Sequence, residues 1–553
     1  MRKLTSFRTP AIAFGIGLAS ALGFAPLNWW FVTLLCFAGL MWLLMAASHV
    51  RGAALLSWCF GVGHFTFGNN WIAQAFTYQE AMPHWLGPIA VFLLALYLAV
   101  FPAIAGTLAW SLNRLPAAIM VRRHHNEIAA RRSKLQGLIP AGMESAVTIE
   151  PPALSPYGFI PLFAGSWVIA EYLRSIAFTG FAWNPLAAIM IAPGSAEPAW
   201  AGLTRLIGTY GLSGFMILLA GIWLLAVLPG TKRIRWQRVG WALLAAMLAQ
   251  ILSAWLLRPL PPRNDPRIIV VQPNINQNEK WDPKLQLANF NRLSALTGKS
   301  KPGDAARLIL WPEAATADFL ETDLAARARI VTLLGPRDII LLGGDSLIFD
   351  RAGELVGARN STFAVDARGD IIGRYDKAHL VPYGEYLPAR AILSAIGLSR
   401  LVPGDIDFWP GPGPATMAAP GFGKVGLQIC YEIIFSGQVI DAANRPDFLF
   451  NPSNDAWFGR WGPPQHLAQA RLRAVEEGMP VIRSTPTGIS AVIDADGRLL
   501  RSLPWHEPGV IEAALPNSRP ATLFARFGNL LPILFALLLL AGGIGVSVRA
   551  GRR

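Results

Sequence analysis

The chain has little cysteine and little charge. Its 553 residues include only three cysteines, and charged residues make up 15% of the total. Cys36 and Cys59 lie in apolar runs and cannot pair with a cysteine in a separate polar domain, which leaves Cys430 as a lone thiol. With 53% hydrophobic residues and a mean hydropathy of +0.39, the composition excludes an ordinary soluble enzyme and indicates a membrane protein.

Several motifs that mark common chemistries are absent. The sequence contains no Gly-rich phosphate loop, no HExxH, no paired CxxC and no GxSxG. Its eight histidines are scattered, and neither His379 nor His466 has a second ligand at a useful spacing. We therefore predict no metal site and no cofactor.

Apolar runs long enough to cross a bilayer are frequent instead. A spanning helix needs about 20 apolar residues. Eight runs meet that length, at about 10–27, 29–48, 53–75, 85–112, 157–177, 203–229, 239–257 and 529–548. The first has the basic start and apolar middle of a signal peptide, but the spans behind it favour a retained helix.

The net charge of +14 lies in basic clusters between these runs. Lysine and arginine gather at 2–8, 51, 114–134, 232–238 and 549–553, which is every second connection. Because basic loops stay in the cytoplasm, we predict cytoplasmic termini and place the segment after the seventh run outside, in the periplasm of a bacterial cell. This location explains the basic charge without nucleic acid, and the loop at 114–156 is expected to be a solvated linker.

The segment from 259 to 522 has the composition of a soluble α/β domain. Strand patterns occur at 267–272, 307–311, 338–343, 361–365, 424–430, 447–451, 480–483 and 489–493, and helical patterns at 283–298, 321–334 and 464–478. This order predicts sheets of mixed direction covered by helices. We expect a seven-helix bundle over 1–258, this domain over 259–522, and a last spanning helix and tail over 523–553.

The Pro-, Gly- and aromatic-rich stretch 380–417 is predicted to form loops that cover a site and touch lipid.

Three short strings each place a titratable residue next to the end of a strand pattern, at 308–311, 371–375 and 424–430. LILWPEAA carries Glu313, GRYDKAHLVPYGEYLP carries Lys377 with Glu385 eight residues on, and GKVGLQICYEIIF carries Cys430. A thiol is a weak nucleophile until a base removes its proton or a cation stabilises the thiolate, so it needs a neighbour such as Glu or Lys. Alone, Cys430 also fits a small buried hydrophobe.

These strings resemble the carbon-nitrogen hydrolase, or nitrilase, superfamily, whose members carry Glu, Lys and Cys in this order. The apolar runs and the strings LVPYGEYLP, ICYEIIF, NPSNDAWFG and RSTPTGISAV are similar to those of the bacterial apolipoprotein N-acyltransferase family. The resemblance is sharp over 267–495 and implies an α-β-β-α sandwich joined to about eight membrane spans. Pro273 departs from it, because the family usually has glycine there.

The resemblance implies a ping-pong acyl transfer without a cofactor. Cys430 would take an acyl chain from a phospholipid, typically phosphatidylethanolamine, as a thioester and pass it to the α-amino group of a diacylglyceryl-cysteine at the N-terminus of an apolipoprotein. Glu313 would be the base and Lys377 the oxyanion stabiliser. Supporting positions would be Glu385, Trp281, Asn360, Tyr431 and Glu432, and an aromatic pair at the entrance would be Trp457 and Phe458. We expect a monomer in the bacterial inner membrane.

Two other functions remain open from the residues alone. A membrane-anchored amidase acting on a small molecule would need a closed polar pocket, whereas this domain carries long apolar loops. A transporter or non-catalytic lipid-binding protein would need intramembrane charges, and only Glu171 and Arg174 qualify. We expect these two residues, three apart on one helix face, to form a structural pair.

Overall fold

The computed structural model describes residues 8–78, 83–115, 155–191, 194, 200–228, 231–262, 264–301, 303–388, 390–395 and 407–551. Most of the predicted linker at 114–156 lies outside the described residues, as does 396–406 of the predicted covering loops.

The apolar runs form helices. In chain order these are α1 (Arg8–Ser20), α2 (Trp30–Ala46), α3 (Val50–Gly68), α4 (Leu86–Leu98), α6 (Pro156–Ile176), α7 (Thr204–Val227), α8 (Lys232–Leu256) and α15 (Leu530–Gly551). Among the described residues, four helical stretches are long and apolar enough to cross a membrane: Leu86–Leu115, Ala201–Val227, Lys232–Leu256 and Leu530–Arg549. By length and composition these stretches support the predicted membrane region, while the number of eight spans stays a prediction. The basic residues at 232–238, expected before a span, belong to the first turns of α8.

Close packing in the bundle depends on small residues. A Cβ at Gly17 of α1 would lie 2.1 Å from the Phe60 carbonyl oxygen of α3, and one at Gly63 of α3 would lie 2.2 Å from that of Phe14. Glycine lets the two backbones approach, which is how membrane helices gain packing energy without a hydrophobic driving force between them.

The domain after α8 contains two sheets. Within the described residues, one six-stranded sheet has the order β12-β1-β2-β3-β4-β5 and the other has the order β11-β10-β9-β8-β7-β6. The first is built from β1 (Arg267–Gln272), β2 (Arg307–Leu310), β3 (Ile339–Phe349), β4 (Leu355–Asp366), β5 (Ile371–Asp376) and β12 (Gly509–Ala514). The second is built from β6 (Thr416–Ala419), β7 (Gly423–Leu427), β8 (Phe448–Pro452), β9 (Val481–Ser484), β10 (Ala491–Ile493) and β11 (Leu499–Ser502).

Each sheet has parallel strands at its centre and antiparallel strands at its edges. Strands β1, β2 and β3 are parallel, as are β7, β8 and β9, while β12, β4, β5, β6, β10 and β11 run antiparallel to their neighbours. The predicted mixture of strand directions is therefore confirmed. The edge strands β6, β11 and β12 had no predicted counterpart.

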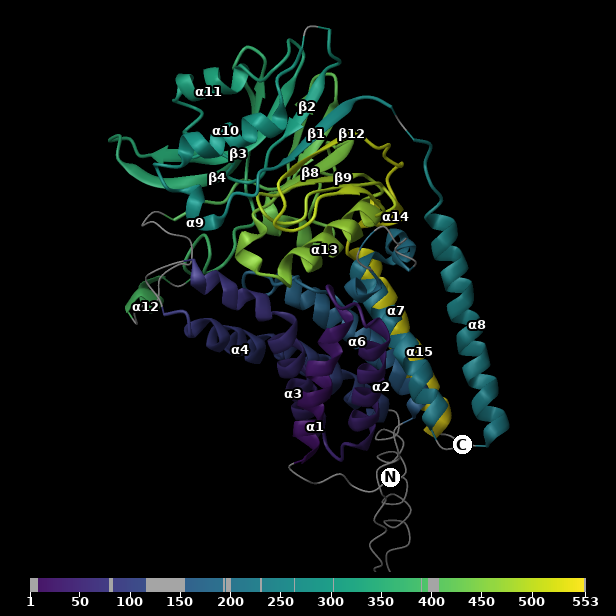
Figure 1. Ribbon diagram of the computed structural model, residues 1–553. Helices are drawn as coiled ribbons and strands as arrows, with labels where there is room; N and C mark the ends of the chain where they lie inside the picture. The colour runs from purple at the N-terminus through teal and green to yellow at the C-terminus, as the bar shows by residue number, and fades with distance from the viewer. Residues whose placement is uncertain are drawn as a thin grey trace, which may run out of the picture.

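The sheets pack face to face, with helices outside. Alternation along β1 sends Ile268 and Val270 into the core shared with Val425 and Leu427 of β7, and sends Ile269 to the opposite face. That opposite face is covered by α10 (Gln286–Thr297) and α11 (Leu324–Val331), while α13 (Gly462–Glu477) lies between the second sheet and the helical bundle (Figure 1). The expected α-β-β-α order is thus confirmed.

Candidate active site

Three chain segments bring Glu313, Lys377 and Cys430 to one place. Glu313 follows β2, Lys377 follows β5 directly, and Cys430 lies beyond β7. The Lys377 Nζ atom is 3.5 Å from Glu313 Oε1, and the pKa of the Cys430 thiol responds to the charges of both residues. All three are buried, with 6%, 1% and 4% of their surfaces exposed.

Lys377 is held by a second glutamate and an asparagine. Its Nζ donates a hydrogen bond of 2.9 Å to Glu385 Oε1. Asn360 on β4 donates from Nδ2 to Glu313 Oε1 at 2.7 Å and to Glu385 Oε1 at 3.0 Å. Two of the predicted supporting residues, Glu385 and Asn360, therefore join this cluster. In the part of the chain that the structure describes, Glu313 Oε2 has no hydrogen-bond partner.

Cys430 does not end a strand, which corrects the prediction of a strand over 424–430. Strand β7 stops at Leu427, and Cys430 begins a 3₁₀ turn, η5 (Cys430–Ile434), with a φ of 52°. Residues other than glycine rarely adopt this left-handed conformation, and such strain is often found at functional sites. The Cys430 carbonyl accepts hydrogen bonds from Asn451 Nδ2 at 3.3 Å and His466 Nε2 at 3.1 Å, which hold the turn in place.

Burial and neighbouring charges set the protonation states of Cys430 and Lys377 in the resting site. Burial and the Glu313 charge raise the pKa of the Cys430 thiol well above its usual value, against the opposing effect of Lys377. Burial alone would lower the pKa of Lys377, but Glu385 and Glu313 raise it above its usual value. At neutral pH the resting site therefore holds a thiol beside an ammonium, and the thiol needs a base before it can react.

Glu432 links the turn that carries Cys430 to the segment that carries Lys377. Its Oε1 accepts from the backbone N–H of Ala378 at 2.7 Å and of His379 at 3.0 Å, and its Oε2 accepts from the N–H of Ile429 at 2.7 Å. Burial raises the pKa of Glu432 to about 7, against these hydrogen bonds. Glu432 therefore joins the two segments by hydrogen bonds, and its supporting role stays a prediction.

Tyr431 connects the site to the bundle. Its hydroxyl lies 3.4 Å from the Gly180 carbonyl oxygen, in the segment that follows α6. His379 makes a similar contact, 2.9 Å from its Nε2 to the Thr179 carbonyl oxygen. The turn that bears Cys430 therefore rests directly against the membrane region.

The predicted aromatic residues lie in different surroundings. Trp281 is 40% exposed, whereas Phe458 is only 6% exposed and packs edge-on against Trp71 and Trp183. Trp457 is partly buried and packs edge-on against Tyr78, with 5.5 Å between ring centroids. Both members of the predicted entrance pair thus contact the bundle, and in this conformation Phe458 is buried.

Sequence reasoning missed two charged groups near Glu313. Lys280, at the end of α9 (Gln277–Lys280), donates from Nζ to the Glu313 carbonyl oxygen at 2.9 Å. Burial lowers the pKa of Lys280 to about 8, although Glu313, Asp345 and Cys430 oppose the shift. Asp345 stands opposite Asn360 in the register of β3 and β4, and burial raises its pKa to about 6. The only sequence signal for Lys280 was its position beside Trp281.

His466 is the third missed residue. The sequence presents His466 only as a metal-ligand candidate without a second ligand, and no group of three His, Cys, Asp or Glu side chains that could hold a metal occurs among the described residues. Instead, its Nδ1 lies 2.9 Å from Asp455 Oδ1 while its Nε2 supports the Cys430 carbonyl. No local pattern could have paired residues 36 positions apart.

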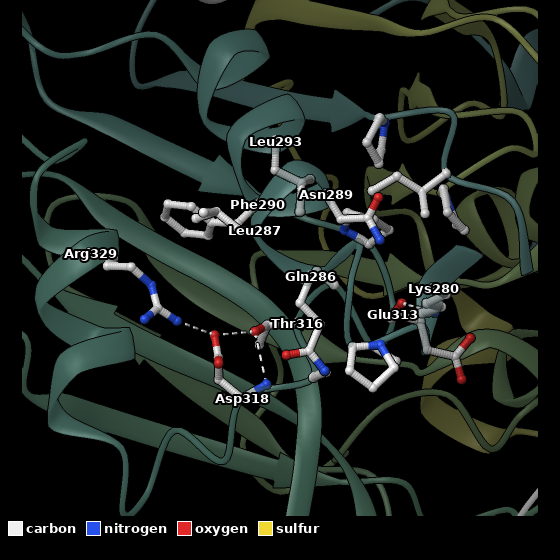
Figure 2. Close-up of a pocket in the computed structure, with 18 residues that line it drawn as sticks. Lys280, Gln286, Leu287, Asn289, Phe290, Leu293, Glu313, Thr316, Asp318 and Arg329 are labelled. Carbon is white, nitrogen blue, oxygen red and sulfur yellow. Dashed lines mark hydrogen bonds and ion pairs between the residues drawn. The ribbon is translucent and has the colours of Figure 1, made fainter. Parts of the chain in front are cut away.

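A cavity of about 370 Å³ adjoins the site on the side of α10. Figure 2 shows Lys280 and Glu313 at one end and the ion pair of Asp318 with Arg329 at the other. Gln286 and Thr316 lie between them, while Cys430 and Lys377 do not line it. This cavity therefore extends away from the thiol, past Lys280.

Comparison with known proteins agrees with this architecture. Residues 267–522 match the carbon-nitrogen hydrolase family, so the two-sheet domain is a carbon-nitrogen hydrolase domain. Residues 16–222 match the apolipoprotein N-acyltransferase N-terminal domain. The chain belongs to the apolipoprotein N-acyltransferase family.

Relatives of nearly full length support that assignment. An apolipoprotein N-acyltransferase of Caulobacter vibrioides is 33% identical, with 98% of this chain and 95% of the relative covered. One of Bradyrhizobium diazoefficiens is 32% identical over the same shares. Among solved structures, an amidase from Nesterenkonia sp. AN1 is 19% identical with a TM-score of 0.32, covering 47% of this chain and 94% of the amidase.

Proposed function

We propose that this protein transfers a fatty acyl chain from a phospholipid to the N-terminal α-amino group of a diacylglyceryl-cysteine in an apolipoprotein. The reaction would proceed through a thioester on Cys430. The observation that carries this proposal is the buried meeting of Cys430, Lys377 and Glu313 on a domain that rests on apolar helices.

In the first half-reaction, Glu313 takes the proton of the Cys430 thiol as the sulfur attacks the ester carbonyl carbon. Negative charge moves to the carbonyl oxygen, where the Lys377 ammonium stabilises it. The carbon–oxygen bond to glycerol then breaks, and Glu313 returns the proton to the leaving oxygen. A lysophospholipid departs and the acyl chain remains on sulfur.

In the second half-reaction, the neutral α-amino group attacks the thioester carbon. Glu313 takes a proton from the nitrogen, Lys377 again stabilises the oxyanion, and the carbon–sulfur bond breaks. The proton passes from Glu313 to the sulfur, which restores the thiol and leaves an amide on the lipoprotein. The same base serves both halves because its Oε2 has no fixed partner in the described structure.

Geometry supports the remaining assignments. Glu385 and Asn360 would orient Lys377 and Glu313, while Glu432 and Tyr431 would fix the Cys430 turn. Trp281 would border the site, and Trp457 with Phe458 would form an entrance that opens by leaving the bundle surface.

We further propose the arrangement in the cell. The seven-helix bundle would cover 1–258, the catalytic domain 259–522 would lie in the periplasm, and 523–553 would return the chain to the cytoplasm across the bacterial inner membrane. Phosphatidylethanolamine would be the donor and the enzyme would act as a monomer. The alternation of basic clusters and the apolar helices support this topology.

The test is mass spectrometry of the purified protein mixed with phosphatidylethanolamine. We expect an adduct of one acyl mass on Cys430, discharged by a diacylglyceryl peptide as an N-acylated product. Cys430→Ala should bind lipid, remain folded and form no adduct. An adduct that is discharged only by water or ammonia would favour an amidase, and absence of any adduct on the wild type would overturn the proposal.

A further inference from the structure

Two lysines lie close to Glu313, and their bonding differs. Lys377 Nζ is bound to Glu385 at 2.9 Å and lies 3.5 Å from Glu313, so its charge is matched by carboxylates on either side. Lys280 Nζ donates one hydrogen bond, to the backbone carbonyl oxygen of Glu313. Among the residues that the structure describes, no carboxylate lies within 4.0 Å of Lys280 Nζ.

An ammonium has three donors, so Lys280 retains N–H capacity that these contacts do not use. Its other described contact is the ring of Trp281, 5.8 Å from Nζ to the ring centroid. Lys280 is half-buried, and removing a cation from part of its water without an anionic partner in contact is costly, so such a group is well suited to bind an anionic ligand.

The space next to Lys280 is open to a ligand. The cavity of about 370 Å³ begins at Lys280 and Glu313 and passes Gln286 and Thr316 (Figure 2). This volume is near the lower end of the range for small-molecule sites. Lys280 therefore lies between the Cys430 site and a cavity with polar groups along its length. The charges of Glu313 and Cys430 affect its pKa.

We infer that Lys280 binds the phosphodiester of the acyl donor, whose headgroup then enters the cavity between α9, α10 and the segment after β2. This inference rests on the proposed function, in which the donor is a phospholipid. The phosphate is separated from the reacting ester by the glycerol carbons, so it needs a cation near the Lys377 oxyanion site but distinct from it. A lysine ammonium serves as a point charge for phosphate.

The test compares two acyl donors that differ in phosphate. Acylation of Cys430 is followed by intact-protein mass spectrometry with phosphatidylethanolamine and with a p-nitrophenyl ester of the same acyl chain, which has no phosphate. In Lys280→Gln, kcat/KM for the phospholipid should fall by about 10- to 100-fold, mainly through KM, because a charge-assisted hydrogen bond is lost. For the p-nitrophenyl ester, the fold decrease in kcat/KM caused by Lys280→Gln should be smaller than for the phospholipid by a factor of about ten or more.

Two variants provide controls. Lys280→Arg keeps the charge and should keep most of the phospholipid rate. Lys284→Gln removes an exposed lysine four positions on and should react with both donors as the wild type does. Equal falls with both donors in Lys280→Gln would place Lys280 at the reacting centre or in folding, and no fall would place the phosphate elsewhere. Either result would overturn the inference about Lys280 and leave the proposed function standing. If no phospholipid acylated the wild type, both the proposed function and the inference would be overturned.

A pH profile tests the inference if Lys280→Gln does not fold. Lys280 faces Glu313, Asp345 and Cys430, and burial lowers its pKa to about 8. The ammonium loses its proton as pH rises through 8, so the advantage of phospholipid over the phosphate-free ester should decline above that pH. In Lys280→Arg the guanidinium stays charged, and the advantage should persist. If the advantage of phospholipid declined equally in the wild type and in Lys280→Arg, the inference would be contradicted.

Discussion

Among the buried charge clusters of the described residues, two differ in how their charges are paired. The Cys430 cluster consists of Glu313, Asn360, Lys377, Glu385 and Cys430. The interface cluster, where the catalytic domain meets α7 and α8, consists of Arg205, Arg473, Glu476, Asp496 and Arg519. In the interface cluster the ions meet counter-ions directly: Arg205 pairs with Asp496, Arg519 Nε lies 2.8 Å from Asp496, and Arg473 Nε lies 2.7 Å from Glu476.

The Cys430 cluster leaves reactive atoms available instead. Glu313 Oε2 has no partner among the described residues, and the Cys430 thiol is held neutral by burial. Glu476 Oε2 in the interface cluster also lacks a hydrogen-bond partner in the described part of the chain, but it lies 2.7 Å from Arg473 Nε, so its charge is matched. Such an ion pair is a fixed structural contact, whereas Glu313 Oε2 and the Cys430 thiol can exchange protons with a substrate. We therefore expect changes in the first cluster to affect the reaction and changes in the second to affect stability.

The largest effect is expected for Glu313→Gln. The amide keeps the side-chain shape but cannot take the thiol proton, so the rate of Cys430 acylation should fall by about 10²- to 10⁴-fold. Time-resolved mass spectrometry measures this rate, and lipid binding should be retained. Glu512→Gln, at an exposed position on β12, is the matched control and should acylate normally. Normal acylation of Glu313→Gln would remove Glu313 as the base.

Asp496→Asn tests the interface cluster. The change leaves the Arg205 and Arg519 guanidinium groups without their shared carboxylate, and breaking a buried pair in this way costs about 3–5 kcal/mol. We expect a lower thermal unfolding temperature, measured in detergent, with unchanged acylation per folded molecule. Asp370→Asn removes an exposed carboxylate beside Arg368 and should change stability by about 1 kcal/mol or less. Lost activity in a stable Asp496→Asn protein would contradict the contrast between the clusters.

The smallest effect is expected for His466→Gln. The Cys430 carbonyl loses one of two donors, while Asn451 Nδ2 remains. The cost of one buried hydrogen bond is about 1–3 kcal/mol, so kcat for acylation should fall by about tenfold with KM for the donor unchanged. His506→Gln changes an exposed histidine and serves as the control. A rise in KM alone would show that His466 acts on substrate binding and not on the Cys430 turn.

Much of the site was predictable because strands deliver residues to one edge of a sheet. The patterns of β2, β5 and β7 placed Glu313, Lys377 and Cys430 near strand ends, and the structure brings them together. The edge strands β6, β11 and β12 were not predicted, because they are exposed or only partly buried and their pattern depends on the partner strand.

The sequence by itself determined the membrane region, the α/β domain and the three residues proposed for catalysis. The first two features depend on local periodicity and on runs of apolar residues, while the three residues were singled out by their places after strand patterns and given roles by the resemblance to the carbon-nitrogen hydrolase superfamily. Only the tertiary structure decided the left-handed φ of Cys430, the support of its carbonyl by His466, and the approach of Lys280 to Glu313. Each of these depends on contacts between segments far apart in the chain, and no local pattern of side chains encodes such a contact.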